Sequence, residues 1–225
     1  MSFAAGHILT CLSREWRSEW RNKNTIAASL LFVVATAYLI YFSFKIGRIS
    51  VAPPVWVSLY WMVLLFSSLS VMVKTFAFEE RGMFYFSYPL FHPMVLVFSK
   101  WLVQSIQLLF ISGIALLLFQ LLLSSPPEMN WAGFLVIVAS GSIGFAATLT
   151  MIAGIAARAE NSSLLLSILS LPLLLPQLSM VIKGGFTMAQ GFESSLIFDE
   201  LIILWGLNLI ALSLNLALFS YIWRR

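Results

Sequence analysis

The sequence predicts an all-α integral membrane protein with six membrane-spanning helices. Three observations lead to this class. The chain of 225 residues is 60% hydrophobic. Only 10% of its residues are charged, whereas soluble proteins contain about 25%. Six stretches stay apolar for the roughly 20 residues that a helix needs to cross the hydrocarbon layer. We therefore treat residues 1–225 as a single transmembrane domain.

The predicted spans satisfy their backbone amides within each helix, as a lipid surrounding requires. In chain order they are Thr25–Phe44, Val55–Val73, Trp101–Leu123, Trp131–Ala153, Leu164–Ile182 and Leu201–Ile222. The first stretch is too long for a cleaved signal peptide, and no small-x-small cleavage site follows it, so we expect it to be retained.

Lysine and arginine are divided unequally between the two faces of such a bundle. One face carries only Lys45, Arg48 and Lys183, and the other carries the remaining ten. These are Arg14, Arg17, Arg21, Lys23, Lys74, Arg81, Lys100, Arg158, Arg224 and Arg225. By the positive-inside rule the second face is cytoplasmic, and both termini are expected there. Orientation therefore accounts for the net charge of +4, and no nucleic-acid partner is expected.

Two cytoplasmic segments are expected to lie along the membrane. Residues 1–24 carry an amphipathic pattern in which apolar positions at helical spacing oppose arginines: Ile8, Leu12, Trp16 and Trp20 against Arg14, Arg17 and Arg21. This pattern predicts a helix in the interface, acting either as an anchor or as a docking element. Residues 74–97 combine Glu79, Glu80 and Arg81 with a run of aromatics, and they predict a coupling helix between the second and third spans. In such a helix the charged residues would fix the position of a partner protein, and the aromatic residues would supply the buried contact surface. A partner-free interfacial helix is the alternative.

Two spans carry features beyond hydrophobicity. The fourth has two rows of small residues, one with Ser142, Ala146, Thr150 and Gly154 and the other with Ser140, Gly144 and Thr148. Small residues at this spacing let helices approach closely in lipid, so this helix is expected inside the bundle, for packing or along a substrate path. In the fifth, Pro172 and Pro176 predict a kinked or unwound helix, either moving or static.

The connection after the fifth span is expected to form a short re-entrant or surface helix on the outer side. Its carboxylates, Glu193, Asp199 and Glu200, are expected to be solvated, and no pair among them suggests acid–base chemistry.

Several chemistries have no motif in this sequence. There is no nucleotide-binding P-loop, so ATP hydrolysis is expected to reside in another chain. Neither a haem-attachment motif nor a metal-spaced cluster occurs, and His7 and His92 are expected at the interface. The single Cys11 has no disulfide partner in the chain. No ionisable residue lies near the middle of a span, which disfavours ion-driven transport. We expect no catalytic residue and no directly bound cofactor or metal.

Three stretches resemble the CcmB family, haem exporter protein B. They are "EWR" near the N-terminus, "KTFAFEERGMFYFSY" after the second span, and "GFAATLTMIAGIAARAENSSLLLSILSLPLLLP" across the fourth and fifth spans. The resemblance implies a single six-helix permease domain of the ABC-2 type in the bacterial inner membrane. It further implies a homodimer driven by the ATPase CcmA, which works with CcmC and CcmD and acts indirectly on the haem chaperone CcmE. Haem would be a transported or handled ligand in cytochrome c maturation.

By this resemblance the ATPase docks on Glu79, Glu80, Arg81 and Gly82. Arg158, Glu160 and Asn161 would form a second cytosolic contact. Two alternatives stay open: an ABC-2 permease that exports another amphiphile, such as a lipid or peptide, and a non-transporting membrane scaffold.

Overall fold

The computed structural model is a bundle of six long helices and describes residues 12–17, 23–48, 50–79, 93–156 and 162–222. The long helices are α2 (Lys23–Gly47), α3 (Pro53–Glu79), α5 (Pro93–Leu123), α6 (Trp131–Ala156), α7 (Ser162–Ala189) and α8 (Phe198–Ile222). Residues 12–17 form a short helix, and the 3-10 helix η1 (Ser194–Ile197) leads into α8. No strand occurs in the described ranges, and six helices are long and apolar enough to cross a membrane. The predicted fold class is confirmed.

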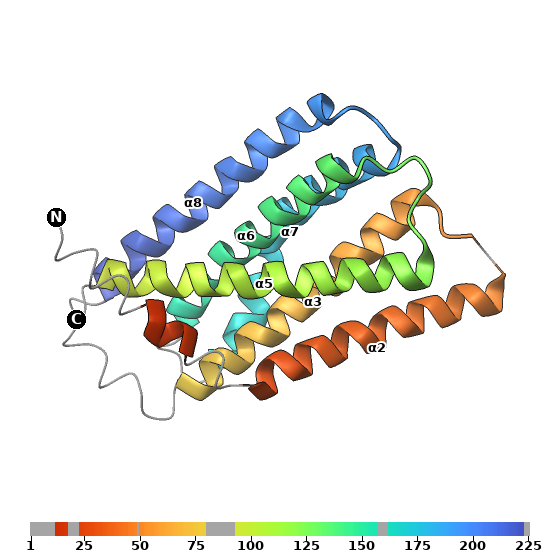
Figure 1. Cartoon of the computed structure of the whole chain (residues 1–225). Helices are drawn as coiled ribbons and strands as arrows, with labels where there is room; N and C mark the ends of the chain where they lie inside the picture. Colours follow the sequence, from red (N-terminus) through yellow and green to blue (C-terminus); the bar gives the residue numbers. More distant parts are fainter. Residues whose placement is uncertain (1–11, 18–22, 49, 80–92, 157–161, 223–225) are drawn as a thin grey trace.

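The helices run alternately up and down between two ends of the bundle (Figure 1). At one end α2 and α5 begin and α3 and α8 end; the connections from α2 to α3, α5 to α6 and α7 to α8 lie at the other. We call the first the basic end and the second the far end, from the distribution of their cations. Among the described residues, the basic end carries Arg14, Arg17, Lys23, Lys74 and Lys100, and the far end Lys45, Arg48 and Lys183.

Three helices extend well beyond the predicted spans. Helix α3 continues past Val73 to Glu79, α5 begins at Pro93 rather than Trp101, and α7 continues past Ile182 to Ala189. In α5 and α7 the apolar composition continues with the helix, because the stretches apolar enough to span a membrane run over Met94–Leu123 and Leu164–Ala189. Proline suits the first turn, where no intrahelical partner for an N–H exists; this explains why Pro53 and Pro93 begin their helices.

Helix α6 is the centre of the bundle and α2 is its periphery. In the membrane-spanning window of α6, 78% of the residues are buried, against 17% for α2. The α6 sequence is rich in glycine, alanine, serine and threonine, so neighbouring helices can pack close to its backbone. The interior position expected for this helix follows from its small side chains.

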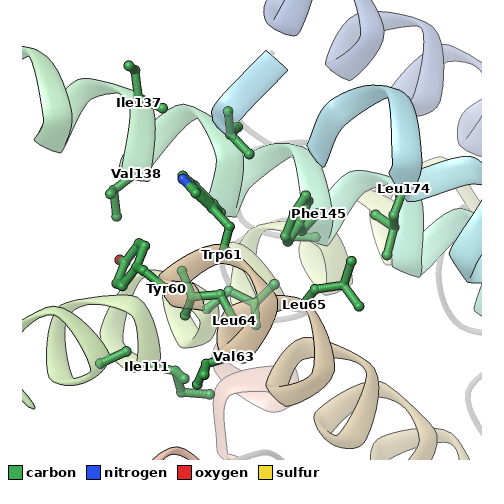
Figure 2. Close-up of a cluster of buried hydrophobic side chains, with 14 of the residues drawn as sticks. Tyr60, Trp61, Val63, Leu64, Leu65, Ile111, Ile137, Val138, Phe145 and Leu174 are labelled. Atoms are coloured by element: carbon green, nitrogen blue, oxygen red, sulfur yellow. The ribbon is translucent and has the colours of Figure 1, made fainter. Parts of the chain in front are cut away.

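A cluster of aromatic rings fills the interior nearer the far end. It consists of Trp56, Tyr60 and Trp61 from α3, Phe119 from α5, and Phe134 and Phe145 from α6. Figure 2 shows Tyr60, Trp61 and Phe145 among the buried aliphatic side chains. The ring centroids of Trp61 lie 5.5 Å from Tyr60 and 5.8 Å from Phe145, both in edge-to-face geometry, which aromatic pairs prefer. The Tyr60 hydroxyl donates to the carbonyl of Ser112, 3.1 Å away, which joins α3 to α5.

Hydroxyl side chains inside the spans bond mostly to their own helix. Thr36 donates to Phe32 O at 2.7 Å, Ser68 to Leu65 O at 2.7 Å, and Ser105 to Trp101 O at 2.8 Å. Serine and threonine can bond to the carbonyl three or four residues earlier. This bonding makes these residues acceptable in lipid-embedded helices without a partner from another helix.

Candidate functional site

The small-residue face of α6 is the meeting place of α7 and α8. Ser142, Ala146, Thr150 and Gly154, the first predicted row, are all buried. The neighbouring row of Ser140, Gly144 and Thr148 is buried as well. Two asparagines of α8 and one glutamine of α7 approach this face, and these three amides are absent from the sequence prediction.

The residues Gln177, Asn208 and Ser140 form a chain of hydrogen bonds that we call the amide clasp. Nε2 of Gln177 donates to Oδ1 of Asn208 at 3.3 Å, and Nδ2 of Asn208 donates to the carbonyl of Ser140 at 3.1 Å. All three residues are buried. The clasp therefore joins α7, α8 and α6 through a single asparagine amide.

Glycine at position 144 makes room for the clasp. A Cβ atom placed there would overlap Oδ1 of Asn208 and lie 2.8 Å from its Cγ. Only a residue without a side chain lets the asparagine amide lie against the α6 backbone. At Gly144 the absence of a side chain on α6 thus makes room for the polar side chain of Asn208.

A second asparagine, two turns further along α8, makes a similar contact nearer the basic end. Nδ2 of Asn215 donates to Oγ1 of Thr150 at 3.1 Å, and that hydroxyl donates to the carbonyl of Ala146 at 2.8 Å. Asn208 and Asn215 are seven residues apart and so lie on one face of α8. Interhelical hydrogen bonds of this kind contribute about 0.6 kcal/mol each on average in membrane proteins. Together they fix the register of α8 on α6.

Some buried polar atoms have no hydrogen-bond partner within the described part of the chain. They include Oε1 of Gln177, Nε2 of Gln104, and both amide atoms of Gln107. Gln104 and Gln107 lie one turn apart on α5, and both are largely buried. A buried amide without a partner costs free energy. Hydropathy analysis overlooks these residues because they carry no charge.

At the far end, an ion pair joins α7 to α8. Nζ of Lys183 lies 2.9 Å from Oε1 of Glu200, whose side chain is only 10% exposed. The expectation that Glu200 is solvated is therefore wrong, whereas Glu193 and Asp199 are exposed as expected. The pairing arises because α7 extends past Lys183 and places the lysine beside the first turn of α8.

The far-end connection is shorter than predicted. After α7 ends at Ala189, Gly191 takes a φ of +79°, and a Cβ there would lie 2.5 Å from the carbonyl of Glu128. The expected re-entrant or surface helix is limited to the four residues of η1. Asn130 joins the start of α6 to this connection. Its Oδ1 accepts a hydrogen bond from the N–H of Gly133 at 3.2 Å and so caps the N-terminus of α6. Its Nδ2 donates to the carbonyl of Phe192.

We expect Lys183→Met to lower the thermal unfolding midpoint of the detergent-solubilised protein, because it leaves the carboxylate of Glu200 buried without its cation. Adding Glu200→Gln should recover much of the loss. The measurement is a double-mutant cycle of the two single variants and the double variant, followed by fluorescence-detected size exclusion after heating. Strictly additive effects would show that the pair is not coupled.

The residues predicted to dock an ATPase lie mainly outside the described part of the chain. Glu79 is the last residue of α3. Six residues fall outside the described ranges: Glu80, Arg81, Gly82, Arg158, Glu160 and Asn161. Of the predicted coupling segment 74–97, residues 74–79 and 93–97 are helical, as the ends of α3 and α5.

The predicted proline break in the fifth span does not unwind the helix. Pro172 and Pro176 both lie inside α7, which is continuous from Ser162 to Ala189. Because helical geometry is kept by the flanking hydrogen bonds, two missing donors do not end the helix. Both prolines are on the exposed side of α7.

Among the residues that the structure describes, no group of three or more His, Cys, Asp or Glu side chains could hold a metal ion. The site consists instead of neutral amides, hydroxyls and small residues between helices.

Fold and site together define a polytopic α-helical membrane domain with a polar, closely packed centre. Residues 6–176 match the family model described as ABC-2 type transporter. The chain therefore belongs to the ABC-2 type transporter family and is a multi-pass membrane component of an ABC transporter, in which ATP is hydrolysed by a partner ATPase. A comparison with curated proteins gives no match.

Proposed function

We propose that this protein is a CcmB-type permease subunit, which couples ATP hydrolysis by CcmA to haem delivery in cytochrome c maturation. The observation that carries the proposal is the resemblance of Gly144–Pro176 to the CcmB family. This segment supplies the basic-end half of α6, which holds Gly144, Thr150 and Gly154, and the start of α7. It therefore includes part of α6, the most buried of the six long helices.

In this proposal the basic end faces the cytosol, as the distribution of lysine and arginine favours. CcmA docks there, CcmC and CcmD are membrane partners, and two copies of the chain form a homodimer. Hydrolysis by CcmA releases the haem-loaded chaperone CcmE on the other side. The permease transmits force to haem handling and itself holds no cofactor.

The proposed docking segment begins at the last residue of α3, Glu79. Helix α3 runs five residues past Lys74, and α5 begins seven residues before Lys100. At a rise of 1.5 Å per residue, the last five residues of α3 place Glu79 about 8 Å beyond Lys74 along the helix axis. Glu79 is the last residue of α3, and Glu80, Arg81 and Gly82 come next in the sequence.

The test is haem staining of c-type cytochromes in a strain that lacks this gene. We expect the wild-type gene to restore the stained bands and Arg81→Glu to abolish them, because the reversed charge repels the docking surface of CcmA. Arg48→Glu, at the far end, is the matched control and should restore staining. Immunoblots of membranes check that all variants are inserted, and co-purification measures bound CcmA.

Each alternative predicts a different result. Stained bands that persist in the deletion strain would contradict the haem assignment and favour an ABC-2 permease for another amphiphile. Complementation by this protein in the absence of any functional ATPase partner would instead indicate a membrane scaffold. Full CcmA binding by Arg81→Glu would move the docking contact to another segment, with Arg158, Glu160 and Asn161 tested next.

A further inference from the structure

Helix α7 consists of two unlike halves. From Leu164 to Pro176, eight of thirteen side chains are exposed and three are buried. From Gln177 to Ala189, only two of thirteen are exposed and six are buried. The buried residues of the first half, Leu166, Ser170 and Leu174, form a single row at four-residue spacing. The basic-end half of α7 therefore touches the bundle along one line, whereas the far-end half is embedded in it.

The far-end half is also held by directional contacts. Gln177, its first residue, belongs to the amide clasp, and Lys183 pairs with Glu200. The carbonyl of Met188 accepts from the N–H of Asn130 at 2.8 Å. Between these points, Gly185 lets α3 approach so closely that a Cβ there would lie 2.9 Å from Cγ1 of Val57. This half is thus fixed to α3, α6, α8 and the loop before α6.

The two prolines lie where the two halves meet. Proline has no N–H, so Pro172 and Pro176 leave the carbonyls of Ile168 and Pro172 without their intrahelical donor. Two consecutive turns therefore each lack one of the hydrogen bonds that resist bending, and prolines are the usual position of helix bends. Pro176 directly precedes Gln177, so the weakened turns end at the clasp.

We propose that the turns from Pro172 to Pro176 are a hinge. The basic-end half of α7 swings about it while the amide clasp and the Lys183–Glu200 pair hold the far-end half in place. The row of Leu166, Ser170 and Leu174 is the narrow line of contact between the moving half and the bundle. Figure 2 shows Leu174 in the buried cluster with Phe145. Movement at the basic end of α7 is thereby confined to that half of the helix.

The experiment measures distance distributions between spin labels by double electron–electron resonance in lipid nanodiscs. Because Cys11 is the sole cysteine of the chain, Cys11→Ser gives a clean background. One label pair, Ile168→Cys with Ala217→Cys, reports on the basic-end half, and Ser179→Cys with Leu209→Cys reports on the far-end half. All four positions are exposed, so the labels do not disturb the core.

We expect the basic-end distribution to be about twofold broader than the far-end one, since it includes bending at both prolines. Pro172→Ala with Pro176→Ala should narrow it to the far-end width. Gln177→Met removes the hydrogen bond from Gln177 to Asn208 and keeps a side chain of similar volume. It should broaden the far-end distribution. The two proline substitutions should still narrow the basic-end distribution in this background.

Equal widths for the two pairs in the wild-type background would overturn the hinge. A broad basic-end distribution that the proline substitutions leave unchanged would also overturn it, because it would indicate fraying of the helix end. The measurement needs no ATPase and no haem, so its result is independent of the proposed role in cytochrome c maturation.

Discussion

Trp61→Ala is expected to destabilise the protein by about 3–5 kcal/mol, the range for removing a buried aromatic side chain from a well-packed core. Trp61 is fully buried. It lies between two glycines, because a Cβ at Gly141 would be 2.5 Å from its Cη2 and one at Gly185 3.4 Å from its Nε1. The neighbouring helix backbones cannot collapse into the space left by the ring. The measurement is the free energy of SDS-induced unfolding in mixed micelles.

The matched control is Trp205→Ala in α8. Trp205 is 44% exposed on the surface of the bundle, so its loss removes contacts with lipid and leaves no cavity. We expect a change below about 1 kcal/mol, as for surface substitutions. An equal loss of unfolding free energy in the two variants would show that the type of residue determines the effect, and not the position of Trp61 between Gly141 and Gly185.

Gly144→Ala is expected to destabilise the bundle by about 1–3 kcal/mol, as overpacking does. The added methyl group overlaps Oδ1 of Asn208. The asparagine must then turn away, which breaks its bonds to Gln177 and Ser140 together. SDS-induced unfolding again measures the effect.

Gly206→Ala is the control for the intrinsic effect of replacing glycine in a helix. No atom lies within 4 Å of a Cβ built at Gly206, in the same α8 that carries Asn208. Alanine should therefore leave stability unchanged or raise it by about 0.5–1 kcal/mol. Combining Gly144→Ala with Asn208→Ala should remove most of the steric penalty. If it does not, the clasp is not the cause of the Gly144 effect.

The number and type of helices could be predicted because the lipid imposes them. A stretch of about 20 apolar residues must form a helix when no water is present to bond its amides. The small residues of α6 likewise predict an interior helix from spacing alone. Helix ends were less predictable, since α3 ends at Glu79 and not Val73, α5 begins at Pro93 and not Trp101, and α7 ends at Ala189 and not Ile182.

The polar contacts between helices could not be predicted in this way. Asn208, Asn215 and Gln177 look unremarkable in a sequence, because each is a single neutral residue in an apolar run. Their importance depends on which face of which helix they meet, and Gly144 provides room only for the residue that lies opposite. The ion pair of Glu200 could not be predicted for the same reason. A carboxylate beside a turn is expected in solvent, and only the extension of α7 brings Lys183 to it.

The sequence by itself determined a six-helix membrane protein, the division of charge between its two ends, the two prolines of α7 and the resemblance to one permease family. These are properties of single segments and depend on local hydrogen bonding, hydrophobicity and charge. Only the tertiary structure decided that Asn208 ties three helices together and that α7 has one embedded and one peripheral half. Both depend on the relative rotation and register of helices, which packing between segments distant in the chain sets.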